Sequence, residues 1–209
     1  MIKLYCTTVD FIADKDKYDT ALECLPEPLR QRAERIRNGD SRLRSAAALM
    51  LLDRALTEEK ITGRELVLGE HGKPYLSSGE VFFNLSHSSK YAVCAICDKE
   101  IGCDVQAISP SLPHAVLKLH PSEIASIERS ASPVRDFFRI WAFKESYMKC
   151  TGKGLCEPLA AFSVDIGKDP PTVDARGYSL SEVFLSDDCA CAVCVRSDTC
   201  PPVEVIWVK

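Results

Sequence analysis

The sequence predicts an α+β fold in which two halves of similar build pack into one compact unit. Strand-like runs alternate with helical patterns along all 209 residues, without a break in composition. A hydrophobic content of 46% is enough for a large core. A short echo between residues 92–95 and 192–195, Ala-Val-Cys-Ala and Ala-Val-Cys-Val, fits two similar halves. We place these halves at residues 1–106 and 107–209.

Composition argues against several classes of protein. The formal charge of −4 lacks the basic excess that nucleic-acid binders usually carry. No apolar run approaches the roughly 20 residues that span a bilayer, and the amino terminus lacks the pattern of a signal peptide. We therefore expect a monomeric, cytoplasmic protein with neither a nucleic-acid nor a membrane partner.

The cysteines allow two interpretations. Eleven is an odd number, so a fully paired disulfide framework is excluded and a reducing compartment is favoured. The CxxC pairs Cys94/Cys97 and Cys191/Cys194 suggest zinc, but each lies in a strand-like run. Positions i and i+3 of a strand point to opposite faces, so one metal ion cannot easily bind both thiols. Buried cysteines that act as small hydrophobic residues are favoured, with zinc as the alternative.

The amino-terminal part predicts one strand and two helices. Residues 2–9 are β-prone, and residues 26–37 form an amphipathic helix opened by two prolines. A second helix, rich in Ala, Leu and Met, begins with Asp40 or Ser41 as its cap and runs to residue 56.

Both helices carry arginines, in the most basic part of the chain. These are Arg30, Arg32, Arg35, Arg37, Arg42 and Arg44. Arg44 and Ser45 lie in the first turn of the second helix, where free amides and the helix dipole favour an anion. Anion binding and an ordinary solvated face both fit the arginine pattern.

The next segments predict short strands and loops. A strand at 66–68 leads into a glycine-rich loop, residues 69–75, that presents Lys73 on a constrained backbone. Residues 81–83 start another strand, and residues 84–90 form a polar turn.

A hairpin then predicts a pair of polar side chains on one face. Residues 91–97 form a strand, 98–100 a hairpin turn, and 101–105 the returning strand. Asp104 and Gln106 are two residues apart, so both project from the same exposed face and can share a metal ion with its water shell. An ordinary solvent-facing aspartate is the alternative.

The second half predicts a connector at 107–133 with a short helix at 122–128, followed by a long aromatic helix at 134–149. Glu145 and Lys149 stand at i and i+4 on the long helix and share a face. They are either an ordinary surface ion pair or functional charged residues on a nearly buried helix. Short strands complete the chain, at 162–164, 183–185, 189–195 and 203–208.

Two carboxylates among cations, Asp104 and Glu145, fit magnesium chemistry. Mg²⁺ usually takes one or two protein carboxylates and completes its shell with water and substrate phosphate oxygens. The sequence therefore favours a phosphorylated ligand. The surrounding cations and polar groups are Arg44, Lys73, Ser86, His87, Lys149 and Lys153.

A set of short motifs resembles the 4′-phosphopantetheinyl transferases of the Sfp type. Their order and spacing match that family over residues 26–164, and the combination is specific although each motif alone is weak. The motifs are Gly72-Lys73-Pro74, Phe83-Asn84-Leu85-Ser86-His87-Ser88, Ile101-Gly102-Cys103-Asp104-Val105, Trp141-Ala142-Phe143-Lys144-Glu145-Ser146-Tyr147-Met148-Lys149 and Gly152-Lys153-Gly154-Leu155.

The resemblance implies a pseudodimer of two α+β halves with coenzyme A in the cleft between them. It also implies a magnesium-dependent enzyme that transfers 4′-phosphopantetheine to a serine of an apo acyl- or peptidyl-carrier protein and releases adenosine 3′,5′-bisphosphate. The carrier would serve fatty acid, polyketide or nonribosomal peptide synthesis. A coenzyme A or nucleotide-binding module without transferase activity is the alternative function.

The resemblance further implies roles for individual residues. Asp104 and Glu145 would bind Mg²⁺ or Mn²⁺, and Glu145 and Lys149 would be catalytic. Many family members carry Glu where this chain has Gln106. Gln106 would either orient a metal-bound water or make the affinity for the metal lower. The residues expected to contact coenzyme A are Arg37, Arg44, Ser45, Lys73, Pro74, Ser86, His87 and Lys149, with Arg30 nearby.

Overall fold

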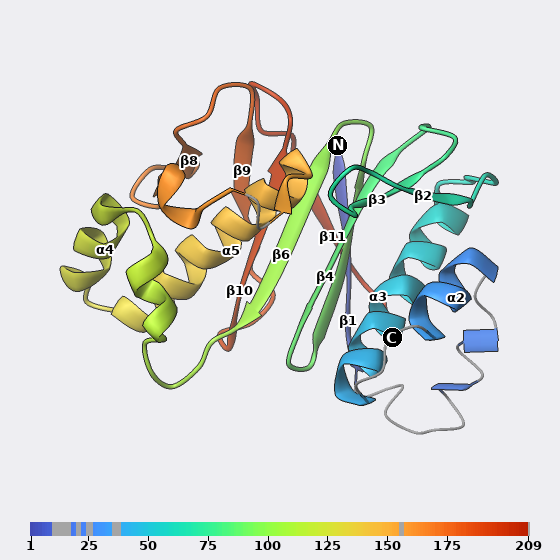
Figure 1. Ribbon diagram of the computed structural model, residues 1–209, viewed down its shortest axis with the longest axis horizontal. Coiled ribbons are helices and arrows are strands. Elements are labelled where there is room, and N and C mark those ends of the chain that lie inside the picture. The colour runs from blue at the N-terminus through green and yellow to red at the C-terminus, as the bar shows by residue number, and fades with distance from the viewer. Residues whose placement is uncertain (10–17, 20–21, 24–26, 35–38, 155–156, 209) are drawn as a thin grey trace.

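The computed structural model describes all residues except 10–17, 20–21, 24–26, 35–38, 155–156 and 209. Two β-sheets lie side by side, and a long helix packs on each of them (Figure 1). The α+β class predicted from the sequence is confirmed.

The first sheet carries the amino-terminal helices. Its strands follow the order β11 (Val203–Trp207), β1 (Ile2–Thr8), β5 (Tyr91–Cys97) and β4 (Phe82–Ser88). The strand β11 runs parallel to β1, and the other pairs are antiparallel. Helix α3 (Gly39–Glu58) packs on this sheet, and α2 (Glu27–Glu34) packs on α3. Small and aliphatic residues recur along α3 at helical spacing, which buries one side of it against β1, β4 and β5.

The second sheet carries the long aromatic helix. Its strands follow the order β6 (Ile101–Ala107), β10 (Cys189–Val195) and β9 (Ser179–Glu182), all antiparallel. Helix α5 (Pro133–Thr151) lies across β6 and β10. Pro133 suits its first turn, and Gly152 ends it in a left-handed conformation with φ 73°.

Smaller elements connect these layers. Helix α4 (Pro121–Glu128) packs on α5, and one hairpin, β2 with β3, follows α3. The remaining elements are β2 (Leu66–Leu68), β3 (Pro74–Leu76), the 3₁₀ turns η2 (His114–Lys118) and η4 (Leu159–Ala161), β7 (Val164–Asp165) and β8 (Thr172–Val173). No helix among the described residues is both long enough and apolar enough to cross a membrane.

The inner faces of the two sheets share a core that explains the CxxC pairs. Cys94 faces the core beneath α3, whereas Cys97 faces the core between the sheets. Cys191 likewise faces the core between the sheets, whereas Cys194 lies under α5. The prediction that each pair points to opposite faces is confirmed, and all four side chains are buried.

Three predictions about strands are wrong. The polar residues 84–88 continue β4 instead of forming a turn, because the turn is confined to Ser89-Lys90, where Ser89 has φ 50°. The strand after residue 100 does not return along β5 but pairs with β10 in the other sheet. Residues 183–185 are not a strand, and β9 ends at Glu182.

Strands β4 and β6 meet where the two sheets adjoin, and side chains join them in place of a backbone ladder. Asn84 Oδ1 accepts from the Cys103 amide at 2.9 Å, Ser86 Oγ from the Val105 amide at 3.3 Å, and Ser88 Oγ from the Ala107 amide at 3.0 Å. Alternate residues of a strand share a face, so these three side chains all reach β6. This polar seam holds the first sheet against the second.

The division at residues 106 and 107 stays a prediction. Two strand pairs connect the two predicted halves: β6 pairs with β10, and β11 pairs with β1.

Candidate functional site

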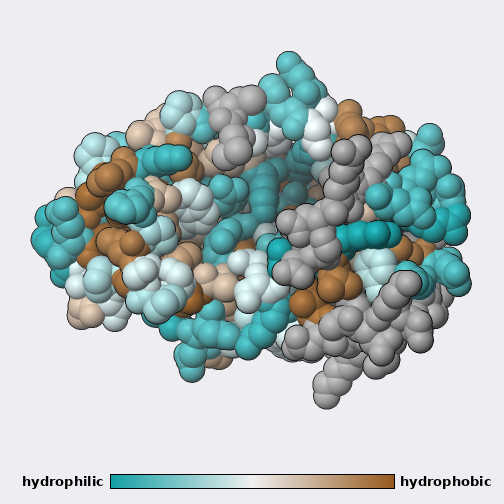
Figure 2. Space-filling view, turned by 60° about the horizontal axis from the view of Figure 1, so that its bottom comes forward, coloured by the Kyte–Doolittle hydropathy of each residue, from teal (hydrophilic) through white to brown (hydrophobic). Residues whose placement is uncertain are grey.

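A pocket of about 380 Å³ opens beside the polar seam. Figure 2 shows that the middle of the displayed face is hollowed and hydrophilic. The pocket lining comes from α3, β4, β6 and α5. It consists of Ser45, Ala48, Leu49, Leu85, Ser86, His87, Asp104, Gln106, Glu145 and Lys149.

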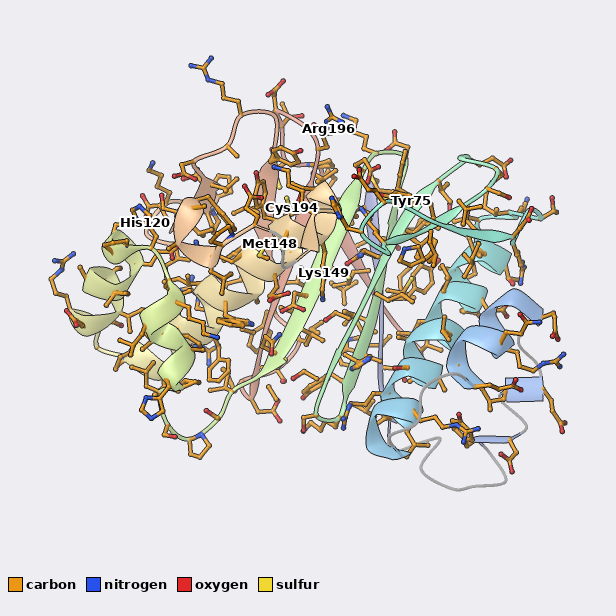
Figure 3. The ribbon with its side chains drawn as sticks, viewed as in Figure 1. Tyr75, His120, Met148, Lys149, Cys194 and Arg196 are labelled. Atoms are coloured by element: carbon orange, nitrogen blue, oxygen red, sulfur yellow. The ribbon has the colours of Figure 1, made fainter. Side chains whose placement is uncertain are left out.

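A glycine lets α5 approach β6 closely enough to form this pocket. A Cβ atom at Gly102 would collide with the Ser146 carbonyl and the Cys150 amide of α5. Only glycine permits so close an approach of two backbones. Lys149, labelled in Figure 3 on α5, therefore lies beside β6.

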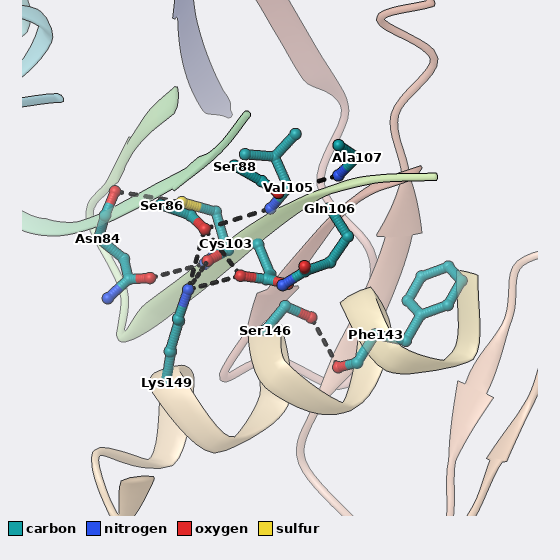
Figure 4. A network of polar contacts seen from close by, with 11 residues as sticks. Asn84, Ser86, Ser88, Cys103, Val105, Gln106, Ala107, Phe143, Ser146 and Lys149 are labelled. Atoms are coloured by element: carbon teal, nitrogen blue, oxygen red, sulfur yellow. Dashed lines mark hydrogen bonds and ion pairs between the residues drawn. The ribbon is translucent and has the colours of Figure 1, made fainter. Parts of the chain in front are cut away.

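Asp104 accepts hydrogen bonds from three side chains, Ser86, Gln106 and Lys149, which are labelled in the polar network of Figure 4. Its Oδ1 accepts from Lys149 Nζ at 2.6 Å and from Ser86 Oγ at 2.7 Å, while Oδ2 accepts from Gln106 Nε2 at 2.8 Å. These contacts confirm that Asp104 and Gln106 share a face. The prediction that this face is exposed is wrong for Asp104, which is 1% exposed because α5 covers β6.

Lys149 is paired with Asp104 instead of with Glu145. Its ammonium also donates to Ser86 Oγ at 3.0 Å and to the Cys103 carbonyl at 3.3 Å. Burial lowers the pKa of Lys149, but the Asp104 carboxylate and the other nearby anionic groups outweigh burial and raise it overall. Lys149 is therefore a cation at neutral pH, and the surface ion pair with Glu145 is not formed in the structure.

Glu145 differs from Asp104 because no described residue donates a hydrogen bond to its half-buried carboxylate. Burial raises its pKa, and the negative charge of Asp104 raises it further, while Lys149 opposes both. A carboxylate that lines a pocket without a donor is available to a ligand.

His87 and Ser45 join β4 to α3 on another wall of the pocket. Ser45 Oγ lies 3.1 Å from His87 Nε2. Burial lowers the pKa of His87, and the nearby charges of Arg44 and Lys149 lower it further. His87 is therefore neutral at pH 7 and offers a ligand a hydrogen bond.

The remaining residues expected to contact coenzyme A lie elsewhere. Lys73 and Pro74 do not line this pocket, and the ammonium of Lys73 is bonded to Glu100 and to two backbone carbonyls. Arg30 forms an ion pair with Glu27 on α2. Arg37 lies outside the described residues.

Comparison with known proteins identifies the segment that carries much of this site. Residues 100–194 match the 4′-phosphopantetheinyl transferase superfamily. The match covers less than half of the chain, and over that segment the chain is similar to this superfamily. The segment contains Asp104, Gln106, Glu145 and Lys149.

Curated relatives of the chain are 4′-phosphopantetheinyl transferases too. A protein of that name from Bacillus subtilis is 34% identical over 142 residues, which cover 66% of this chain and 60% of the relative. The transferase gsp of Aneurinibacillus migulanus is 37% identical over 99 residues, covering 46% and 41%. The transferase Sfp of Bacillus subtilis (strain 168) is 35% identical over 104 residues, covering 48% and 46%. The matches span about half the length of these relatives, and they confirm the resemblance to Sfp-type transferases.

Three residues of this pocket were not predicted from the sequence. Ala48 and Leu49 follow Ser45 by three and four residues, so they lie on the same face of α3. This helical spacing could have extended the pocket from Ser45. Leu85 precedes Ser86 on β4, and nothing in its apolar character marked it as a pocket residue.

The donor set of the pocket fits a magnesium ion. Asp104 and Glu145 are two carboxylates on one pocket, and the Gln106 side chain adds an amide oxygen. Among the described residues, no group of three or more His, Cys, Asp and Glu side chains is placed to hold a metal ion. Magnesium commonly uses few protein carboxylates and takes its other ligands from water and phosphate, so two are sufficient.

Proposed function

We propose that this chain is a 4′-phosphopantetheinyl transferase. It would transfer the 4′-phosphopantetheine arm of coenzyme A to a serine hydroxyl of an apo acyl- or peptidyl-carrier protein and release adenosine 3′,5′-bisphosphate. The observation that carries the proposal is the pocket, in which Ser86, His87, Asp104, Glu145 and Lys149 converge from three separate sequence motifs.

The pocket residues divide into two groups in this proposal. Asp104, Glu145 and Gln106 would hold Mg²⁺ or Mn²⁺, which supplies positive charge to the pyrophosphate. The second group would contact the phosphates of coenzyme A. Lys149 provides the charge, and Ser45, Ser86 and His87 provide hydrogen bonds.

The reaction breaks the phosphoanhydride bond of coenzyme A. The serine oxygen of the carrier forms a bond to the phosphorus that carries pantetheine, and the bridging oxygen leaves with adenosine 3′,5′-bisphosphate. Glu145 would take the proton of the serine hydroxyl, because its carboxylate lines the pocket without a protein donor. Lys149 would offset the negative charge on the leaving phosphate, since phosphoryl transfer depends on positioning and charge neutralisation.

The proposed cleft lies between the two helix-covered sheets. Two features support two similar halves: β5 and β10 are the middle strands of their sheets, and both are buried along their whole length. The pocket takes residues from α3 on one side and from α5 on the other. Arg37 and Arg44 would bind the nucleotide end of coenzyme A.

A cytoplasmic location and a monomeric state are parts of the same proposal. The nine described cysteines are all free thiols, which suits a reducing compartment. Coenzyme A and the carrier protein would be the partners, without nucleic acid or membrane.

The test is incubation with coenzyme A, Mg²⁺ and a panel of apo carrier proteins, followed by intact-mass analysis of each carrier. We expect one carrier to gain the mass of one phosphopantetheine. Glu145→Ala should remove most of the transfer, whereas Glu128→Ala, at an exposed glutamate of α4, should not. If coenzyme A binds in equilibrium dialysis but no carrier gains mass, the chain is instead a non-catalytic binding module.

A further inference from the structure

The side chain of Lys73 is enclosed by protein groups. Residue 73 is 8% exposed, and its ammonium donates to Glu100 Oε2 at 2.8 Å, the Ile101 carbonyl at 3.0 Å and the Cys150 carbonyl at 3.1 Å. A lysine ammonium has three N–H donors and no acceptor. All three donors are therefore used. The three donors of Lys149 are used as well, but Lys149 lines the pocket and Lys73 does not.

The three acceptors belong to two elements that form the pocket. Glu100 and Ile101 stand at the start of β6, whereas Cys150 lies in the last turn of α5. The last four carbonyls of a helix have no partner within the helix, and a cation there also suits the helix dipole. Lys73 thus caps the carboxyl-terminal end of α5 and ties it to β6.

Further contacts fix the same junction. Cys150 Sγ donates to the Glu100 carbonyl at 3.3 Å. A Cβ atom at Gly152, the residue that ends α5, would lie 3.1 Å from the hydroxyl of Tyr75 and 3.6 Å from Lys73 Cδ. The β2–β3 hairpin, which carries Tyr75, therefore lies against the end of α5.

The junction controls the distance between the two walls of the pocket. Lys149 directly precedes Cys150, and its ammonium contacts Asp104, three residues beyond Ile101. A shift of α5 relative to β6 would move Lys149 and Glu145 away from Asp104 together.

We infer that Lys73 is a positioning residue that holds the end of α5 against β6, and that its ammonium makes no direct contact with coenzyme A. The inference rests on the proposed function, and it departs from the expectation drawn from the family resemblance. Glu100 neutralises the buried charge of this junction, because its carboxylate forms an ion pair with the Lys73 ammonium.

The experiment compares Lys73→Met, Glu100→Gln and the double variant. Lys99→Met, at an exposed lysine in the turn before β6, is the matched control. For each protein, kcat and KM for coenzyme A are measured in the carrier assay, the Kd for coenzyme A by equilibrium dialysis, and backbone hydrogen exchange over residues 146–152 by mass spectrometry.

We expect both single variants to lower kcat about 10- to 100-fold through misplacement of the pocket groups. KM and Kd for coenzyme A should change by the same factor in Lys73→Met and Glu100→Gln, because both variants displace Lys149 through one junction and neither removes a ligand contact. The double variant should be no worse than Lys73→Met, because both substitutions break one junction. Exchange over residues 146–152 should rise in all three variants and stay unchanged in the control.

Two results would overturn the inference. One is a tenfold or greater rise in Kd for coenzyme A in Lys73→Met that Glu100→Gln does not share, because this marks a direct ligand contact. The other is unchanged hydrogen exchange in both single variants. If Lys73→Met does not fold, Glu100→Gln alone decides, since it leaves the lysine in place. If the wild-type protein modifies no carrier, the proposed function fails, while dialysis and hydrogen exchange still test the role of Lys73.

Discussion

Asp104 and Glu145 are both carboxylates of the pocket, but they differ in their hydrogen-bond partners. Asp104 is enclosed and accepts hydrogen bonds from Lys149, Ser86 and Gln106. Glu145 accepts none from the described residues, and burial raises its pKa. Removing the Asp104 carboxylate should therefore lower the stability of the fold. Removing the Glu145 carboxylate should lower the proposed activity and leave the stability unchanged.

We expect Asp104→Ala to lower the free energy of unfolding by about 1–3 kcal/mol, because it leaves the buried end of Lys149 without its anionic partner. Glu145→Ala should change it by less than about 0.5 kcal/mol. Thermal unfolding of the two variants, beside Asp198→Ala as a control, measures this difference at about 2–4 °C per kcal/mol. Equal melting temperatures for the two variants would contradict the description of the Asp104 network.

Gln106 stands beside the first pocket carboxylate, and its amide donates to Asp104 Oδ2. In Gln106→Glu this donor becomes a second carboxylate beside the first, which like-charge repulsion opposes. We expect the variant to be about 1 kcal/mol less stable than wild type in EDTA and to gain more stability from Mg²⁺, since a ligand stabilises the state that binds it.

The Gln106→Glu variant should keep transferase activity with a lower Mg²⁺ midpoint. Ser78→Asp adds one charge at an exposed position and serves as the control. An unchanged Mg²⁺ titration, measured by both thermal shift and activity, would place Gln106 outside the surroundings of the metal.

At the scale of elements, the contact between α5 and β6 builds the pocket. Gly102 makes this contact possible, Lys73 holds its end, and the polar seam from β4 fixes the other side of β6. The pocket residues on these elements are therefore positioned by backbone contacts outside the pocket.

Gly102→Ala should displace α5, because its Cβ would meet backbone atoms that cannot rotate away. We expect a loss of about 3 kcal/mol or more in the free energy of unfolding, measured in urea, together with loss of carrier modification. Gly63→Ala is the matched control, since its Cβ would meet only the Ser78 side chain, at 3.3 Å. Wild-type stability of Gly102→Ala would show that α5 can move without cost.

At the scale of the whole molecule, β11 joins the first sheet although it follows the second sheet in the sequence. The strand β11 pairs with β1 in parallel, and Ile206 packs against the core beneath α3. The carboxyl-terminal strand therefore stabilises the amino-terminal sheet.

Substitutions at two neighbouring residues of β11 should differ in their effect on stability, because one side chain packs on the core and the other is exposed. Ile206→Ala should cost about 1–2 kcal/mol of stability, and Val205→Ala, at an exposed position, less than about 0.5 kcal/mol. Urea unfolding of the two variants measures the contrast, and equal effects would mean that β11 contributes only its backbone.

Hydrophobic pattern and motif spacing determined much of this protein by sequence alone. They located β1, β5, β10 and the long helices to within a few residues, and they placed Asp104 with Gln106 and Glu145 with Lys149 on shared faces. These features depend on the periods of helix and strand, which are local properties of the chain. Motif spacing likewise indicated the transferase superfamily.

Tertiary structure decided which of these local pieces meet. Asn84, Ser86 and Ser88 look like a turn in the sequence, because polar residues normally leave the core. They instead extend β4, since the backbone amides that donate to their side-chain oxygens lie on a strand of the other sheet. The burial of Asp104 and the hydrogen bond from Lys73 to the end of α5 also depend on contacts between distant segments. No local period encodes such contacts, because they arise only once the two sheets and α5 have packed.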